Sequence, residues 1–117
     1  MTPTEKRRDT YLRKYYGITL AQYNKLASSQ QGRCYICQRE QQNFKRNLSV
    51  DHCHVRGTVR GLLCPWCNRG LKYFRDDPDW LKRAAKHVQR DPLGARVPDK
   101  YLKGQPKKRK RKKNNAT

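Results

Sequence analysis

Apolar residues in the first part of the chain recur at the spacing of two amphipathic helices. Residues 5–16 predict a short basic helix, and Gly17 is a typical residue for its carboxyl-terminal end. Thr19 and Gln22 then have the spacing of a capping box, which marks the start of a second helix. The polar segment 30–32 would end that helix, so a helical hairpin is predicted. The apolar face of the second helix would consist of Leu20, Tyr23, Leu26 and Ala27.

The middle of the chain changes to a pattern of short strands. Residues 38–47 have no apolar period and predict a loop. Segments 48–50 and 58–62 predict two short strands, and Arg56-Gly57 is a turn signal between them. A short helix is expected over 65–74. The pattern therefore predicts a β-hairpin that is followed directly by a helix.

A further amphipathic pattern follows, and it opens on a strong helix-start signal. Asp77 has the position of an amino-terminal cap, and Pro78 has that of the first helical residue. The helix is predicted to run to Asp91-Pro92, because the residue before a proline disfavours the helical conformation. This helix should pack on the core or on the partner in a homodimer. Its apolar face would consist of Leu81, Ala84, Ala85 and Val88.

Together these patterns predict a small α+β protein with little hydrophobic core. Leu, Ile, Val and Phe account for 19 of the 117 residues. A fraction below about 20% in a highly charged chain is typical of sequences that cannot fold by apolar burial alone, so a structural staple is expected. The predicted segments are a helical lead-in at 1–31, a ββα core at 32–75 that needs the staple, a helix at 76–91 and a basic, flexible, disordered tail at 92–117.

Two CxxC pairs are the natural candidates for that staple. Tetrahedral zinc takes four ligands, and four thiolates leave no open coordination position, so this zinc should be structural. The predicted zinc ligands are Cys34, Cys37, Cys64 and Cys67. Two alternatives are four unrelated buried thiols and an iron–sulfur cluster. A third alternative gives one of the ligand positions to Cys53 or His54.

The formal net charge of +20 implies a polyanionic partner, most simply nucleic acid. Basic and aromatic residues at 7–16 are candidates to face DNA, although the tyrosines among them have packing on the domain as an alternative role. The tail contains seven consecutive Lys and Arg residues, which favour a flexible arm on the phosphate backbone over a nuclear localisation signal. The DNA-binding residues predicted there are Lys107, Lys108, Arg109, Lys110 and Arg111.

No apolar run is long enough to cross a membrane, and the first residues have no signal-peptide pattern. The cysteines have the spacing of metal ligands and do not suggest a disulfide framework. A reducing, intracellular location is therefore expected.

A second group of chemically active residues surrounds the turn of the predicted hairpin. Asp51 and Asn68 offer the hard oxygen ligands that Mg2+ prefers. His52 is a candidate general base, since an imidazole can take a proton from water at neutral pH. His54 would share a strand face with His52 if the strand continued, and could hold a scissile phosphate. Arg56, Arg60, Arg69 and Lys72 could position neighbouring phosphates. In the alternative interpretation, Asp51 and both histidines are ordinary surface polar groups.

In chain order these motifs read C-x-x-C, V-D-H-x-H and V-R-G-L-L-C-x-x-C-N-R-G-L. With the helical lead-in and the later DDPDWLKRAAKHV, they resemble the recombination endonuclease VII family of the HNH (ββα-metal) nucleases over roughly residues 7–90. The resemblance implies a zinc-braced ββα fold, often an intertwined dimer, that cuts DNA with Mg2+ or Mn2+. It also implies that Asp51 and Asn68 bind the catalytic metal, that His52 is the general base and that His54 lies near the phosphate.

The resemblance leaves the substrate open. The best-known activity of the family is cleavage of branched DNA such as four-way junctions, whereas other small phage HNH proteins cut ordinary duplex, some beside the packaging machinery. The expected partners are DNA, a second copy of the chain and phage packaging proteins, in the cytoplasm of the bacterial host if the chain is phage-encoded. The alternatives are a zinc-ribbon DNA-binding protein without catalysis and a ribosomal-type RNA-binding protein. Neither of them needs Asp51, His52 and Asn68.

Overall fold

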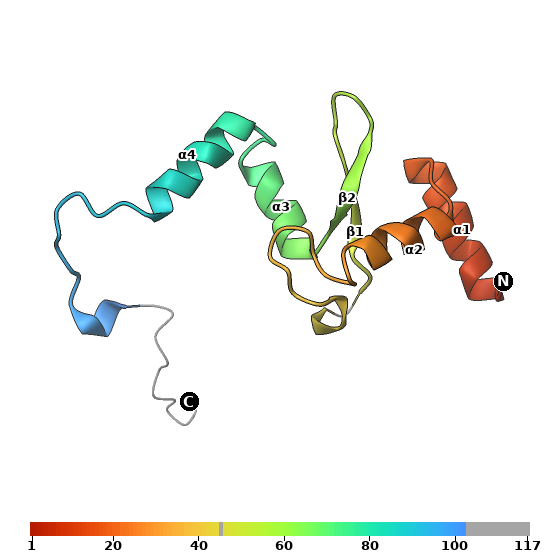
Figure 1. Cartoon of the computed structure of the whole chain (residues 1–117), viewed down its shortest axis with the longest axis horizontal. Helices are drawn as coiled ribbons and strands as arrows, with labels where there is room; N and C mark the ends of the chain where they lie inside the picture. Colours follow the sequence, from red (N-terminus) through yellow and green to blue (C-terminus); the bar gives the residue numbers. More distant parts are fainter. Residues whose placement is uncertain (45, 103–117) are drawn as a thin grey trace, which may run out of the picture. The chain divides into compact units, whose positions relative to one another are not determined.

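The computed structural model describes residues 1–44 and 46–102. The chain divides into two compact units, residues 1–82 and 83–117. The described elements confirm a small α+β protein in which two strands are followed by a helix, and the four predicted segment boundaries stay predictions. The helices and strands are α1 (Pro3–Tyr16), α2 (Leu20–Ser29), β1 (Ser49–His52), β2 (Val59–Leu63), α3 (Pro65–Tyr73) and α4 (Pro78–Val88), with 3-10 turns at η1 (Gln41–Asn43) and η2 (Asp99–Tyr101) (Figure 1).

Both amino-terminal helices begin at capping boxes. In α1 the Thr2 hydroxyl accepts a hydrogen bond from the Glu5 amide at 3.1 Å, and the Glu5 carboxylate accepts one from the Thr2 amide at 2.8 Å. The box predicted at Thr19 and Gln22 is present at the start of α2. Gly17 ends α1 with φ 69°, a left-handed conformation that a glycine adopts without steric conflict. The helical hairpin is therefore confirmed, although α1 starts two residues earlier than predicted because Thr2 caps it.

A small cluster of buried side chains holds residues 1–82 together. Tyr23 reaches across this cluster, and its hydroxyl donates to the Leu48 carbonyl at 2.6 Å. This bond satisfies two polar groups in a buried position. The cluster combines side chains of α1, α2 and the hairpin with two cysteines: Leu12, Tyr23, Cys34, Leu48, Val50, Leu62, Leu63 and Cys64.

The two strands pair antiparallel, and their register shifts within the hairpin. Asp51 lies opposite Gly61, whereas the next residue, His52, lies opposite Val59. Arg60 is therefore the extra residue of a β-bulge. Successive side chains of a regular strand point to opposite faces, and a bulge shifts this alternation by one residue. As a result the side chain of Arg60 can reach the carboxylate of Asp51, and the two form an ion pair.

The hairpin turns immediately after β1. β1 ends at His52, and His54 lies in the turn, so the strand does not continue as a shared strand face for the two histidines would require. The Cys53 amide donates to the Thr58 carbonyl at 2.8 Å, and the Gly57 amide donates to the Cys53 carbonyl at 2.7 Å. Gly57 has φ 75°, which allows the chain to reverse here.

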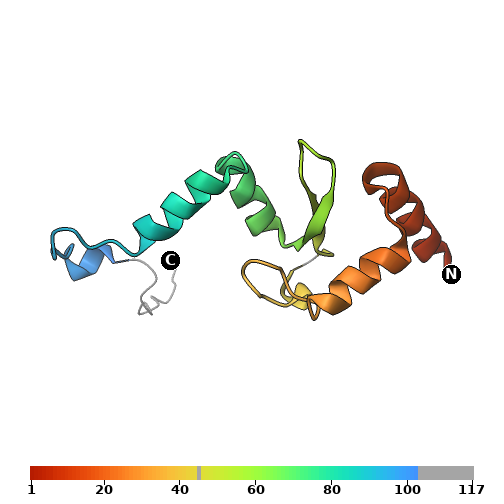
Figure 2. The same ribbon diagram turned by 45° about the horizontal axis from the view of Figure 1, so that its top comes forward.

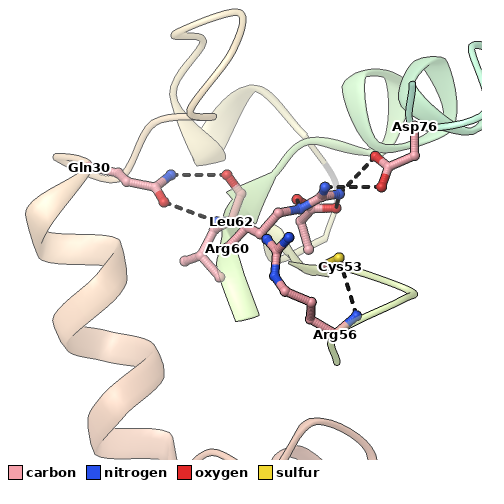
Figure 3. Close-up of polar contacts among 7 residues, drawn as sticks. Gln30, Cys53, Arg56, Arg60, Leu62 and Asp76 are labelled. Carbon is pink, nitrogen blue, oxygen red and sulfur yellow. Dashed lines mark hydrogen bonds and ion pairs between the residues drawn. The ribbon is translucent and has the colours of Figure 1, made fainter. Parts of the chain in front are cut away.

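The side chain of Gln30, just after α2, is bonded to the backbone of β2 as a neighbouring strand would be. Its amide nitrogen donates to the Leu62 carbonyl at 3.0 Å, and its amide oxygen accepts from the Leu62 N–H at 2.9 Å (Figure 3). Gly61 beside it has φ 155°, and a Cβ at this position would lie 3.1 Å from the Gln30 amide oxygen. The end of α2 is thus fixed to the outer edge of β2.

Within residues 1–82 the hairpin has helices on two sides. α3 contacts both strands, and α2 contacts β2. Both views show α3 on one side of the hairpin and α1 with α2 on the other (Figures 1 and 2). Side chains from α1 and from α3 can therefore both approach the hairpin residues of interest.

α4 begins where the sequence predicts. The Asp77 carboxylate accepts hydrogen bonds from two backbone amides of the first turn, at 2.8 and 3.2 Å. The helix ends at Val88 and does not reach Asp91, because residues 89 and 90 bond to carbonyls three positions back and so tighten the chain into a turn.

The apolar face of α4 is only partly covered by the described residues. Leu81 and Ala84 are half-buried, whereas Val88 is 83% exposed. Packing of this helix on the core or on a dimer partner stays a prediction. In the predicted tail, η2 is a turn that the sequence pattern does not indicate. The basic block at 107–113 lies outside the described residues.

Candidate metal centre and active site

The four paired cysteines converge on one point. Their Sγ atoms all lie within 4.8 Å of one another, and the sulfurs of Cys37 and Cys64 are 3.8 Å apart. Four thiolates that bind zinc tetrahedrally at about 2.3 Å have sulfurs about 3.8 Å apart. The number of donors, their chemistry and their spacing therefore fit a structural zinc. The set is Cys34, Cys37, Cys64 and Cys67, as predicted.

The start of α3 is built into this centre. Cys64 is the amino-terminal cap, and its sulfur accepts a hydrogen bond from the Cys67 amide at 3.3 Å. Pro65 takes the first helical position, where no amide hydrogen is needed. Cys34 and Cys64 are both fully buried. A zinc ion here would connect the loop after α2 to α3 and would supply the staple that the small core requires.

Cys53 does not belong to this cluster. It is buried at the hairpin turn, where its sulfur accepts a hydrogen bond from the Arg56 amide at 3.4 Å (Figure 3). Hydrogen bonds from the amides of Arg56 and Val55 lower the pKa of the Cys53 thiol, against a smaller effect of burial. The four clustered thiols are complete without Cys53 or His54, so the structure gives no support to either as a substitute ligand.

Arg39 is a neighbour of the metal centre that the sequence analysis missed. Its Nε donates to the Cys37 sulfur at 3.2 Å, and its guanidinium carbon lies 4.8 Å from the centre of the Trp66 ring. Trp66 in turn packs edge-on against Phe44, with ring centres 5.3 Å apart. Four thiolates around Zn2+ carry a net negative charge, which this arginine offsets. Arg39 is part of an unpatterned loop, so only its position next to a CxxC pair could have suggested the role.

At the hairpin, Arg60 connects two carboxylates. Its Nε and one terminal nitrogen donate to the Asp51 carboxylate at 2.8 and 3.0 Å. Both terminal nitrogens donate to Asp76, at 3.0 and 2.9 Å (Figure 3). Only 12% of the Asp51 side chain is exposed, against 33% for Arg60 and 25% for Asp76. Arg60 thus has two carboxylate partners where the sequence suggested a phosphate.

The charges of this bridge reinforce each other. Hydrogen bonds from Arg60 lower the pKa of Asp76, although partial burial opposes the shift. The charge of Arg60 and the nearby imidazoles of His54 and His52 lower it further. The two carboxylates raise the pKa of Arg60, so its guanidinium stays charged at neutral pH.

These residues border a pocket of about 360 Å3 between the hairpin and α3. The pocket combines predicted site residues from three places in the sequence, and it adds Arg75 and Asp76, which were not predicted. Asp76 directly precedes the cap of α4, so the helix-start pattern accounts for an acid there and gives no signal of a site. The lining residues are Asp51, His54, Val55, Arg60, Asn68, Leu71, Lys72, Arg75 and Asp76.

The two histidines stand beside each other at the turn. Their ring centres are 4.7 Å apart, and the His52 ring also lies 5.9 Å from the ring of Tyr16 in α1. His52 is half-buried and His54 is exposed. Arg56 and Arg69, which were also predicted to contact phosphates, are exposed and are not among the described residues that line the pocket.

None of the described helices has both the length and the apolar character that a bilayer-spanning helix requires.

Comparison of the sequence with known proteins shows which family it matches. A family model described as recombination endonuclease VII matches residues 9–90. The Gene 59 proteins of Mycobacterium phages D29 and L5 are each 46% identical to this chain over 94 residues. The alignments cover 76% of this chain and 56% and 57% of those two proteins. The chain therefore spans little more than half the length of these curated relatives.

Proposed function

Since this chain belongs to the recombination endonuclease VII family, we propose that it is a metal-dependent DNA endonuclease of the HNH class. The convergence of Asp51, His54 and Asn68 on one pocket, with His52 beside them, is the observation that supports this proposal most. β2 ends and α3 begins at Cys64, which belongs to a cysteine cluster suited to zinc. A protein that only binds DNA has no need of this set of polar groups.

The proposed chemistry is hydrolysis of a phosphodiester bond. His52 takes the proton from the attacking water, which an imidazole can do at neutral pH. His54, exposed at the turn, contacts the scissile phosphate. Asp51 and Asn68 would hold Mg2+ or Mn2+, which supplies charge stabilisation at the leaving oxygen when bound. Zinc at the four cysteines is structural in this proposal and takes no part in the reaction.

Arg60 has a different role from the one that the sequence suggested. Its fork holds both oxygens of Asp51, and Asp76 holds the other side of the fork. In the proposed enzyme, Arg60 is a positioning residue that fixes the orientation of the Asp51 carboxylate. Lys72 and Arg75 border the same pocket and are better placed to contact phosphates there.

The natural substrate in this proposal is DNA during phage DNA processing, either branched or in ordinary duplex form. The phage origin of the two relatives supports the setting, and the family description supports a link to recombination. A homodimer and an association with packaging proteins remain part of the proposal.

Incubation of supercoiled plasmid with Mg2+ or Mn2+ tests the function directly. The wild type should nick the plasmid, and His52→Ala should lose nicking by at least about 100-fold, since a general base contributes about that much or more. His87→Ala is the matched control, because this exposed histidine lies in α4 and outside the pocket lining. It should cut like the wild type.

A zinc-ribbon protein that binds DNA without cutting it is the rival proposal. It would be favoured if zinc-loaded, folded wild type failed to nick under all these conditions while it still bound DNA. Equal nicking by the wild type and by His52→Ala would retain a nuclease but would remove His52 as its base.

A further inference from the structure

Five rings from α1 and from the hairpin turn form a continuous row, which we call the aromatic row. It consists of Tyr15, Tyr11, Tyr16, His52 and His54. Consecutive ring centres lie 4.8, 6.2, 5.9 and 4.7 Å apart. These distances are within the range of favourable aromatic contacts. The row therefore runs without a break from the exposed face of α1 to the proposed general base.

The outer end of the row is accessible. Tyr11 is 51% exposed and Tyr15 is 58% exposed, so their rings are available on the surface of α1. Packing on the domain, the alternative role for the tyrosines, applies to the half-buried Tyr16 only. The two exposed rings also border a shallow groove of about 440 Å3 along one face of α1. Its other lining residues are Lys6, Arg7, Thr10 and Lys14.

The groove carries positive charge that the described residues do not neutralise. Within the described part of the chain, no carboxylate lies within ion-pair distance of Lys6, Arg7 or Lys14. The two acids of α1 have other partners: Glu5 is in the capping box, and Asp9 accepts from Arg13 at 2.7 Å and from the Leu20 amide at 2.8 Å. These cations are exposed next to the two rings, and Lys14 also lies over one side of the Tyr15 ring, with its Nζ 5.2 Å from the ring centre.

Cations beside exposed rings along a groove are the features that bind single-stranded nucleic acid. The cations follow the phosphates, and the rings stack on successive bases whatever their identity. The bases of an intact duplex are stacked on each other and cannot use such rings. The combination consequently selects DNA in which bases are unpaired.

We propose that this face of α1 binds the unpaired bases of a single-stranded DNA segment and leads that segment along the aromatic row to His52. The preferred substrate would then contain a single strand next to a duplex, such as a flap or a gap. This inference rests on the proposed function for DNA as the partner, but it concerns binding and does not require cleavage.

Fluorescence anisotropy without added Mg2+ or Mn2+ measures this binding separately from catalysis. The two probes are a labelled duplex with a single-stranded flap and a blunt duplex of the same length. The double variant Tyr11→Leu, Tyr15→Leu should bind the flap more weakly by at least about 5-fold to 150-fold, the loss expected for a single base stack, and by more when both rings stack. Its affinity for blunt duplex should change less than 2-fold.

Two sets of variants separate stacking from charge. Tyr11→Phe, Tyr15→Phe keeps both ring faces and should retain the flap affinity. Lys14→Gln should weaken both probes and flatten the salt dependence of the logarithm of the affinity by about 0.7 to 0.9, as expected for one phosphate contact. Tyr73→Leu is the control for an exposed tyrosine elsewhere, since Tyr73 is 78% exposed on α3.

Equal loss for flap and blunt duplex in the Leu variant would overturn the inference, as would unchanged affinity for both. A loss of self-association in sedimentation, without any change in flap binding, would assign the tyrosines to a protein interface and would also overturn it. Plasmid nicking that persists in any of these cases would leave the proposed function in place.

Discussion

Arg60 shows how one residue can organise a site without reacting. The bulge brings its side chain to Asp51, and the planar guanidinium matches two carboxylates at once. Such a fork restricts Asp51 to one orientation. A lysine at this position could place a charge but could not hold both oxygens in the same way.

Asp76→Asn should lower the free energy of unfolding by about 1 kcal/mol, because it removes one side of a partly buried, forked ion pair. Asp76 has a lowered pKa in the folded protein, so its contribution is fully present above the ordinary carboxyl pKa and is lost only as the pH falls through the lowered value. The loss should therefore be the same at about pH 6 and about pH 8. Urea denaturation with zinc in excess measures it.

The control for this prediction is Asp99→Asn. Asp99 also pairs with an arginine, Arg96, but the two side chains are 89% and 72% exposed, and exposed pairs contribute little. Its effect should be smaller than that of Asp76→Asn. If Asp76→Asn lowered the free energy of unfolding no more than Asp99→Asn, the Arg60–Asp76 ion pair would not stabilise the fold as expected.

Residues whose role depends on local spacing could be predicted from the sequence, whereas residues with distant partners could not. The capping box at Thr19 and the left-handed Gly17 are decided by neighbours within one helical turn. Asp76 pairs with Arg60 of the hairpin, and Arg39 lies over the ring of Trp66 in α3, so both have partners that are distant in the sequence. No period or motif in a single sequence records such contacts.

At the level of elements, the hairpin is held from outside by α2, and the cysteine cluster lies where β2 meets α3. Sequence pattern was sufficient to predict both strands and the helix after them, because alternation and turn residues are local signals. The end of β1 was predicted two residues too early: the strand runs to His52, and the turn begins directly after it, since Cys53 and Gly57 close it. The bulge at Arg60 has no sequence signal of its own except the adjacent Gly61.

Gln30→Ala should lower the free energy of unfolding by about 1 to 2 kcal/mol, because the N–H and the carbonyl of Leu62 both lose the same partner. Urea denaturation followed by circular dichroism gives the value. Gln89→Ala, at an exposed position after α4, should have almost no effect. Equal effects of the two substitutions would show that the two hydrogen bonds between Gln30 and Leu62 contribute nothing to stability.

Gly61→Ala and Gly70→Ala should change stability in opposite directions. A Cβ at Gly61 would add strain at φ 155° and would press on the Gln30 amide, so a loss of more than about 1 kcal/mol is expected. Gly70 is inside α3 with open space around it, so alanine there should add about 0.5 to 1 kcal/mol. Destabilisation of similar size in both variants would contradict the explanation that Gly61, unlike Gly70, is required by its backbone conformation and by the nearby Gln30 amide.

At the level of the whole molecule, the small apolar core and the cysteine cluster lead us to expect that folding depends on metal. The fold class and the cluster of four cysteines could be predicted, because composition and CxxC spacing are properties of the sequence itself. For the pocket between the hairpin and α3, the sequence indicated the kinds of polar residue that would be present but not the full set that lines it. Its actual lining depends on how the bulge and the helices meet.

Removal of zinc by a chelator should abolish the cooperative unfolding transition and most of the helical circular dichroism signal. Cys64→Ser should have the same effect, since Cys64 both contributes a thiolate and caps α3. Cys53→Ser is the matched control and should bind one zinc per chain, because Cys53 is outside the cluster. An unchanged circular dichroism spectrum after verified loss of zinc would refute the structural role.

The pair of hydrogen bonds between the Gln30 side chain and the Leu62 backbone also affects how the protein behaves at high concentration. Each strand of a two-stranded sheet has an edge at which another molecule can add a strand and begin an aggregate. At Leu62 that edge is already occupied, because the Gln30 amide binds both backbone groups and the Tyr35 N–H adds a bond to the carbonyl at 3.2 Å. A side chain from a helix end thus takes the place of an intruding strand. Loss of Gln30 would for this reason appear during storage as slow self-association through β2.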